Sequence, residues 1–311
     1  MQYPRTPAPW RQLCALPGLS RRIYPDADDA PARWWLVGQV LRHLGDHFHL
    51  LDALHQRRWN ALLRRQPQVL RKAHQQYPFH GLDRRARIDW LLGHWQACEQ
   101  QLGRGLSRGL QRGREFTVCE LDLPDGQGRL PVRLGPARQN HLREGDLTLT
   151  LFDPFGTRLY AMTFSLQPLA DGGCEVVVGA LQSRMPLELT RHLTRLSHGL
   201  RPANLMVELL QGLAGAMGVQ RLRACGRERH IHHGSEKAEL VQFNYDGFWE
   251  SCGGQADGEG FFLLPVAPAR RRHEDMPSHK RSQYRRRYAW LDEQQATLRR
   301  LTGAIGMPVR A

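Results

Sequence analysis

The chain has 311 residues, 41% of them hydrophobic, which is enough to bury a substantial core in one large domain or two ordinary ones. Its 44 lysines and arginines exceed its 30 aspartates and glutamates by 14, and this balance favours an acidic partner such as nucleic acid, lipid phosphate or a phosphorylated cofactor. No run of about 18 apolar residues occurs, and the six cysteines are widely spaced, so we expect a soluble, cytoplasmic protein with free thiols.

The first third of the chain has helical periodicity. Apolar residues recur every three or four positions from Val37 to Leu54, which predicts one amphipathic stripe on a helix. Asp83 precedes a second stripe that ends at Trp95, and it is suited to cap that helix. Residues 103–114 combine arginine with glycine, so we expect a loop or linker there. These patterns predict a helical N-terminal domain over residues 1–115.

The period changes after residue 115. Short runs rich in Val, Leu, Phe and Thr, with turn residues at "DPFG" (153–156), predict a three-stranded antiparallel meander over residues 147–181. Helical patterns return over 187–217, and "LVQFNYDGFW" (240–249) is expected to be an aromatic strand or turn. The predicted fold class is α/β of the α+β kind. A helical N-terminal region precedes a second domain, residues 116–311, with a mostly antiparallel mixed sheet flanked by helices and a C-terminal basic helix.

Several stretches in the C-terminal two thirds resemble the VirK/YbjX family of bacterial proteins. They are "VGALQ" (178–182), "HGLRPANLMVELLQGLA" (198–214), "NYDGFWESCGG" (244–254), "DGEGFFLLP" (257–265) and "HKRSQYRRRYAWLDE" (279–293). Where the family usually has a small-residue turn, this chain has "CGRERH" (225–230). The resemblance implies a loose association with bacterial surface properties and virulence, and no defined chemistry.

The predicted order of elements is similar to that of the GNAT N-acetyltransferase fold. In that fold, the helix after the fourth strand points its N-terminus at the pyrophosphate of an acyl donor, because unpaired N–H groups and the helix dipole favour an anion. Here Arg201 and Asn204 stand at the start of the corresponding helix, and a guanidinium at Arg201 is suited to a bidentate phosphate contact. The glycine-rich signature of the fold is missing, and an additional helix precedes this one.

The aromatic segment supplies candidate catalytic groups. Asp246 or Glu250 can act as a general base, and Tyr245 can protonate a leaving thiolate. The same three residues also suit a structural role, in which the aromatic ring packs and the aspartate caps. The nearby "HIHH" (230–233) has no carboxylate or cysteine at ligand spacing, so we expect a polar turn and no metal site.

The basic stretch near the C-terminus holds eight lysines and arginines against two acids between Arg270 and Arg287, a local net charge of +6. Tyr284 and Tyr288 extend an apolar stripe, so we expect this helix to pack on the protein and to present a fixed basic surface. The candidate ligand contacts on it are Lys280, Arg281, Tyr284 and Arg285, which we expect to face the same anion site as the start of the long helix.

Two hypotheses follow from these patterns. The first is an acyltransferase-like enzyme that moves an acyl or aminoacyl group to an amine. Its activated donor would be acyl-CoA, acyl carrier protein or aminoacyl-tRNA, so the co-substrate bears phosphate and no cofactor is tightly bound. The second is a non-enzymatic module whose basic face binds nucleic acid or anionic lipid headgroups. A concave pocket with converging titratable groups favours the enzyme, whereas a broad basic face with steep salt dependence favours the binding module.

Overall fold

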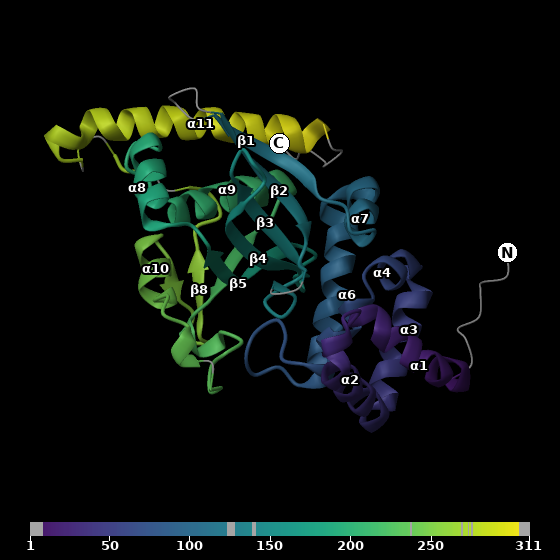
Figure 1. Ribbon diagram of the computed structural model, residues 1–311. Helices are drawn as coiled ribbons and strands as arrows, with labels where there is room; N and C mark the ends of the chain where they lie inside the picture. Colours follow the sequence, from purple (N-terminus) through teal and green to yellow (C-terminus); the bar gives the residue numbers. More distant parts are fainter. Residues whose placement is uncertain are drawn as a thin grey trace.

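The computed structural model describes residues 9–122, 128–138, 141–236, 238–268, 270–272, 274 and 276–304. Within these ranges a region of helices precedes a single mixed sheet, and further helices pack around that sheet (Figure 1). The predicted α+β class, with a helical N-terminal region and a mostly antiparallel sheet, is confirmed.

The helices before the sheet are α1 (Pro9–Ile23), α2 (Ala30–Arg42), α3 (Leu44–Gln56), α4 (Asn60–Arg65), α5 (Arg71–His74), α6 (Arg84–Gln101) and α7 (Gly103–Gln111). The strands are β1 (Phe116–Asp122), β2 (Arg129–Pro136), β3 (Leu147–Phe152), β4 (Arg158–Pro168), β5 (Cys174–Ser183), β6 (Arg221–Cys225), β7 (Gln255–Ala256) and β8 (Phe261–Leu264). The later helices are α8 (Leu187–Leu196), α9 (Pro202–Met217), α10 (Tyr245–Ser251) and α11 (Arg281–Ala304).

The strands are ordered β1-β2-β3-β4-β5-β6-β8-β7 across the sheet. The first five form an antiparallel meander, and its β3-β4-β5 portion is the meander expected from the sequence. The β5 and β6 strands are parallel and are connected through α8 and α9. In Figure 1, α11 lies across one side of the sheet, and α6 runs between the sheet and the other N-terminal helices.

The end of β5 departs from regular pairing in two ways. Thr163 pairs with Ala180 and Phe164 pairs with Val178, so Gly179 is the extra residue of a β-bulge. A side chain at Gly179 would place its Cβ 1.8 Å from the carbonyl oxygen of Glu144, so the loop before β3 lies directly on this bulge. The parallel pairing with β6 ends at Val178, and β5 then continues to residue 183. Bulges of this kind commonly lie next to functional sites.

One large hydrophobic core joins the helical region to the sheet. Leu50 of α3, Leu91 of α6, Leu149 of β3, Leu210 of α9 and Leu298 of α11 all belong to it. Because both α6 and the helix α9 pack against β4, the sheet is buried from both sides. A smaller cluster lies between α1 and α2.

Two local expectations concern the helices before the sheet. The predicted cap is confirmed, because the Asp83 carboxylate accepts a hydrogen bond of 2.8 Å from the Ala86 N–H at the start of α6. The expectation of a loop over 103–114 is wrong: residues 103–111 form α7, in which Leu106 and Leu110 are buried. Gly109 serves packing, since a Cβ on it would lie 2.4 Å from the Phe116 ring.

Two further expectations are also corrected. The apolar stripe from residue 37 to residue 54 lies on two helices that meet at His43, and Leu41 within it is 54% exposed. The segment expected to be an aromatic strand or turn contains α10, whose first turn is capped by the Asn244 side chain accepting from the Gly247 N–H. This cap outweighs the strand preference of the aromatic residues.

Candidate functional site

The candidate site lies at the carboxyl ends of β5 and β6, where the two parallel strands separate. The helix α10 begins there with Tyr245, which is 4% exposed. Its hydroxyl donates to the Leu181 carbonyl oxygen at 3.3 Å and accepts from the Leu181 N–H at 3.4 Å. The tyrosine hydroxyl therefore forms the two hydrogen bonds with the Leu181 backbone that a neighbouring strand would otherwise form.

A cavity of about 190 Å³ adjoins Tyr245. Its other lining residues include Arg227, His230, His232 and Phe243, which follow β6 in the chain. The His230 and Tyr245 rings lie 5.0 Å apart between centroids, and His230 is 5% exposed. The cavity therefore combines a phenol, imidazoles and a guanidinium at the open end of the sheet.

Glu144 is a buried carboxylate on the loop that lies on the β5 bulge. It is 3% exposed and accepts hydrogen bonds of 2.7 and 2.8 Å from the Gln182 side-chain amide. His141 Nδ1 lies 3.5 Å from the same carboxylate. Its negative charge raises the pKa of both Tyr245 and His230, so it acts electrostatically on the cavity.

The protonation states of the two rings follow mainly from burial. Burial lowers the pKa of His230 to about 4, although Glu144 opposes this effect. Burial also raises the pKa of Tyr245, and here the charge of Glu144 acts in the same direction. Near neutral pH the cavity therefore presents a neutral imidazole, which can accept a proton, beside a phenol that retains its proton.

The other two predicted catalytic residues, Asp246 and Glu250, are one helical turn apart on α10. The Asp246 Oδ1 atom accepts a hydrogen bond of 2.7 Å from the Arg227 N–H, so Asp246 holds the turn after β6. Glu250 is exposed to solvent. Of the three residues predicted as catalytic, Tyr245 is the one that lines the cavity.

Of the two predicted phosphate contacts at the start of α9, Asn204 lies near α10. Arg201 is the exposed residue before Pro202, the first residue of the helix, and its side chain forms no cap there. The Asn204 side-chain amide lies 3.5 Å from the Cys252 sulfur, directly after α10. The first turn of α9 therefore contacts one end of α10, and Tyr245 lies at the other end.

The basic helix α11 contacts the loop before α9 through a residue that was not predicted. Arg287 donates hydrogen bonds of 2.9 and 3.1 Å to the His198 carbonyl oxygen, and its guanidinium lies over the Tyr284 ring. Arg281 donates to the Met276 carbonyl at 3.2 Å, whereas Lys280 and Arg285 are exposed. None of the four predicted α11 contacts lines the cavity beside Tyr245.

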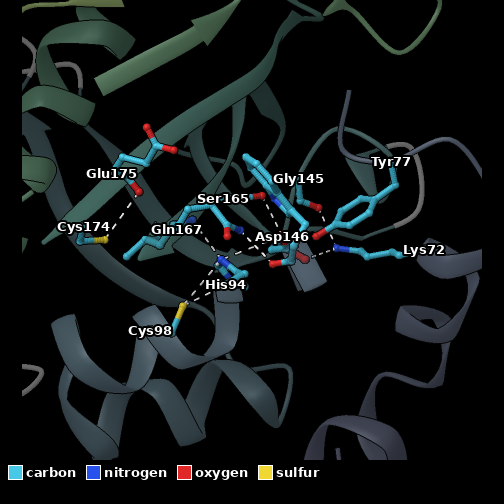
Figure 2. Close-up of polar contacts among 12 residues, drawn as sticks. Lys72, Tyr77, His94, Cys98, Gly145, Asp146, Ser165, Gln167, Cys174 and Glu175 are labelled. Atoms are coloured by element: carbon cyan, nitrogen blue, oxygen red, sulfur yellow. Dashed lines mark hydrogen bonds and ion pairs between the residues drawn. The ribbon is translucent and has the colours of Figure 1, made fainter. Parts of the chain in front are cut away.

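A second polar cluster, which we call the sealed network, lies between the helical region and the sheet (Figure 2). It consists of Lys72, Tyr77, His94, Asp146 and Ser165. The Lys72 ammonium lies 2.6 Å from Asp146 Oδ1 and donates to the Gly145 carbonyl at 2.8 Å. Tyr77 and Ser165 both donate to Asp146 Oδ2, Ser165 at 2.7 Å.

His94 completes this network from α6. Its Nδ1 atom accepts a 3.0 Å hydrogen bond from the Leu166 N–H of β4, and it lies 3.9 Å from Asp146 Oδ2. All five side chains are at least nine-tenths buried. Although burial opposes ionisation, Lys72 and His94 lower the pKa of Asp146, so the pair is ionic. Because solvent does not reach these groups, they fasten the helices to the sheet rather than meet a substrate.

Sequence reasoning had missed Glu144, Gln182 and the members of the sealed network. His230 was considered only as part of a histidine-rich turn, and residues 231–234 do form a turn. Among the residues that the structure describes, no group of three histidines, cysteines or acids is arranged to hold a metal ion. In the same ranges, no helix has the length and apolarity needed to cross a membrane. All six cysteines are free thiols.

Comparisons with known proteins place this chain among uncharacterized bacterial proteins. The family model described as "Protein of unknown function (DUF535)" matches residues 26–300. An Escherichia coli K12 protein described as "Uncharacterized protein YbjX" is 30% identical over 247 residues, covering 75% of this chain and 72% of that protein. An uncharacterized Haemophilus influenzae protein is 25% identical over 223 residues, with 69% and 71% covered. No solved structure matches the chain.

Proposed function

Since the chain belongs to the VirK/YbjX family, which is described as a protein of unknown function (DUF535), we propose its activity from its own site: acyl transfer from an activated donor to an amine. The observation that carries the proposal is the opening between β5 and β6, where a protonated phenol and a neutral imidazole share one cavity. In sheets with parallel strands, ligands commonly bind at the carboxyl ends of those strands. The similarity to the order of elements in GNAT acetyltransferases supports the same location.

The proposed chemistry needs only these two groups. The amine nitrogen attacks the acyl carbon, and His230 accepts the proton that the nitrogen loses. The bond from the acyl carbon to the leaving thiolate or alkoxide then breaks, and Tyr245 supplies the proton that the leaving group takes. The proton on His230 replaces the one that Tyr245 has given up. Glu144 favours the protonated forms of both rings through its charge, and so acts as a positioning residue.

The donor is proposed to bear phosphate, as acyl-CoA, acyl carrier protein and aminoacyl-tRNA all do. Arg227 lines the cavity, and Arg201 lies at the start of α9, where the helix dipole favours an anion. The first turn of α9 is separated from Tyr245 by α10, a helix of seven residues, or about 10 Å. Such a donor is abundant in the cytoplasm, which is the compartment we propose.

The test measures donor cleavage directly. Purified protein is incubated with acyl-CoA donors from acetyl to palmitoyl and with acylated carrier protein, with and without a panel of amines. Thiol release and the masses of the products are followed. We expect Tyr245→Phe to lower kcat by about 100-fold or more while changing KM little, because it removes a proton donor and leaves the cavity shape intact.

A matched control is Tyr160→Phe, since Tyr160 is a half-buried tyrosine of β4 that does not line the cavity beside Tyr245. Its rate should equal that of the unmodified protein. Equal rates for Tyr245→Phe and the unmodified protein, or no donor cleavage under any condition, would count against acyl transfer at this site.

A second function is favoured by a specific observation in the helical region. A wide hollow of about 730 Å³ there is lined by Ala61 and five arginines, namely Arg22, Arg64, Arg65, Arg112 and Arg114. This surface suits a polyanion such as nucleic acid or an anionic lipid headgroup. If it neutralises a nucleic acid, the slope of log affinity against log salt should fall by about one for each arginine replaced by glutamine. A flat salt dependence would exclude this role.

A further inference from the structure

A row of small side chains crosses four strands of the sheet. In the register of the strands, Gly135 of β2 is paired with Thr148 of β3, which is paired with Thr163 of β4, and Thr163 with Ala180 of β5. Side chains on one sheet face normally fill the space above it. Of this row, Thr148 lines a hollow on this face, whereas the Glu115 side chain takes the space beside Gly135.

The hollow is a cavity of about 240 Å³ that is distinct from the one beside Tyr245. Thr148 and Thr150 lie on its floor, and Pro136 and Phe152 contribute apolar walls. The charged residues that line it are Arg138, His141, Arg158, Arg184 and Glu115. Three guanidinium groups therefore face one carboxylate in a confined space.

The arginines are held close together by the backbone. The Arg184 N–H, just after β5, donates a 3.0 Å hydrogen bond to the Leu159 carbonyl oxygen, the residue after Arg158. Burial and then the positive charge of Arg184 both lower the pKa of Arg158. The Arg158 guanidinium also contacts His141 Nε2. Arg158 and Arg184 thus repel each other, and an anion between them would relieve that repulsion.

A buried hydroxyl on the floor of this cavity is unsatisfied. Thr148 is 6% exposed, and its Oγ1 atom has no hydrogen-bond partner among the residues that the structure describes. An unpaired buried hydroxyl is costly, and native proteins rarely keep one without a reason. The oxygen itself is covered in the unliganded protein, so a χ1 rotation of Thr148 has to turn it toward the cavity before a ligand oxygen can accept this hydrogen bond.

We propose that this cavity is a binding site for a phosphate group carried by a small molecule, held by Arg158 and Arg184 and by the hydroxyl of Thr148. A phosphomonoester carries a charge of about −1.5 to −2 at neutral pH and has three acceptor oxygens, which suits two guanidiniums and a hydroxyl better than a singly charged carboxylate does. His141, which lines this cavity, contacts both Glu144 and Arg158, and no residue that lines this cavity also lines the one beside Tyr245. It does not depend on acyl transfer.

The test is a titration of the full-length protein with inorganic phosphate, followed by calorimetry and by ³¹P line broadening, in the absence of any acyl donor. We expect one saturable site per chain. Arg184→Gln should weaken phosphate binding roughly tenfold to hundredfold, as removal of a charge-assisted contact does. Thr148→Val, which keeps the shape of the side chain, should weaken it several-fold. Because Arg184 is exposed, its replacement should leave the fold intact.

Two matched controls accompany these variants. Arg191→Gln removes an exposed arginine of α8, and Thr157→Val changes an exposed threonine in the turn before β4; neither should alter phosphate binding. Losses at Arg191 equal to those at Arg184 would show nonspecific charge attraction and overturn the site. No saturable binding by the unmodified protein would overturn it as well. Acetate binding as tightly as phosphate would overturn the assignment to phosphate.

Discussion

Two acidic residues in one loop, Glu144 and Asp146, stand in opposite situations although they are two positions apart. Both carboxylates are almost fully buried. Asp146 lies in the sealed network, where an ammonium, a phenol and a serine hydroxyl satisfy it. Glu144 receives its hydrogen bonds from the neutral amide of Gln182, and its neighbour His141 lines the cavity with Arg158 and Arg184. Burial of a charge therefore does not by itself identify a functional site; the groups that surround the charge distinguish the two carboxylates.

The two carboxylates should also differ in what they contribute to the fold. A buried ion pair adds little net stability compared with an apolar pair, but loss of one member leaves the other charge buried and uncompensated. Asp146 has such a partner in Lys72, which is 2% exposed. The charge of Glu144 instead acts on arginines and on ionisable rings around the cavities. The three predictions below test this division.

The largest expected effect is that of Asp146→Asn. It strands the Lys72 ammonium in the interior, so the free energy of unfolding should fall by about 3–5 kcal/mol. Glu144→Gln makes the same acid-to-amide change two residues away and should cost less than about 2 kcal/mol. Urea unfolding of both variants measures the contrast. Equal losses would show that Glu144 is as structural as Asp146. Lys72→Met combined with Asp146→Leu removes both charges but leaves the Tyr77 and Ser165 hydroxyls without their acceptor, so it should recover only part of the lost stability.

The next effect is a dependence of stability on pH through His94. Burial lowers the pKa of His94 in the folded protein to about 4, whereas an unfolded histidine titrates near 6.5. As the pH falls, the unfolded chain binds this proton first. The contribution of His94 is therefore complete above about pH 6.5 and is lost as the pH falls toward 4. At about 1.4 kcal/mol per pH unit, the loss approaches about 3 kcal/mol.

His94→Asn should flatten this dependence, since an amide oxygen can still accept the hydrogen bond from the Leu166 N–H. Thermal unfolding between pH 7 and pH 4 provides the measurement. His279→Asn, at an exposed position before α11, is the control and should leave the slope unchanged. Part of the slope should remain, because burial also lowers the pKa of His47, His74 and His230. A slope equal to that of the unmodified protein would mean that His94 does not contribute.

The smallest effect comes from a single methyl group at the bulge. Gly179→Ala places a Cβ 1.8 Å from the Glu144 carbonyl oxygen, so the loop must move, at a cost of about 1–3 kcal/mol. Gly215→Ala in α9 meets no atom within 4 Å and should stabilise the helix by about 0.5–1 kcal/mol. The unfolding temperatures of the two variants, measured by calorimetry, should therefore shift in opposite directions. A neutral Gly179→Ala would mean that the loop tolerates displacement and does not position Glu144.

Sequence patterns predicted the parts of this fold that depend on residues close to one another in the chain. The capped helix that begins after Asp83 and the meander over 147–181 follow from local periodicity and turn chemistry. The helix α7 was missed because its glycines suit a loop locally, and only contact with Phe116 explains Gly109. Tyr245 was a candidate from the sequence because its aromatic segment is conspicuous and short, and the structure places it at a cavity.

The remaining site residues come from distant segments that the fold brings together. Gln182 reaches Glu144 across 38 positions, and the phosphate cavity takes Arg138, Arg158 and Arg184 from three separate segments. The residues that flank each of these positions in the sequence form no motif that would mark a site. The basic run of α11 is conspicuous in the sequence, but a high density of charge does not tell which way each side chain points. Arg287 donates to the loop before α9, whereas Arg285 is exposed to solvent. Strand register and one bulge decide these placements.

The packing of α11 on β1 has a consequence for biosynthesis. The Cys119 thiol of β1 lies 3.9 Å from the Gln294 carbonyl of α11, 175 positions later in the chain. The first strand of the sheet therefore leaves the ribosome well before the helix that covers it. Until α11 has been synthesised, apolar surface of β1 remains uncovered in the nascent chain. Contacts of such long range are slow to form, so this protein should depend on chaperones during synthesis more than its finished core suggests.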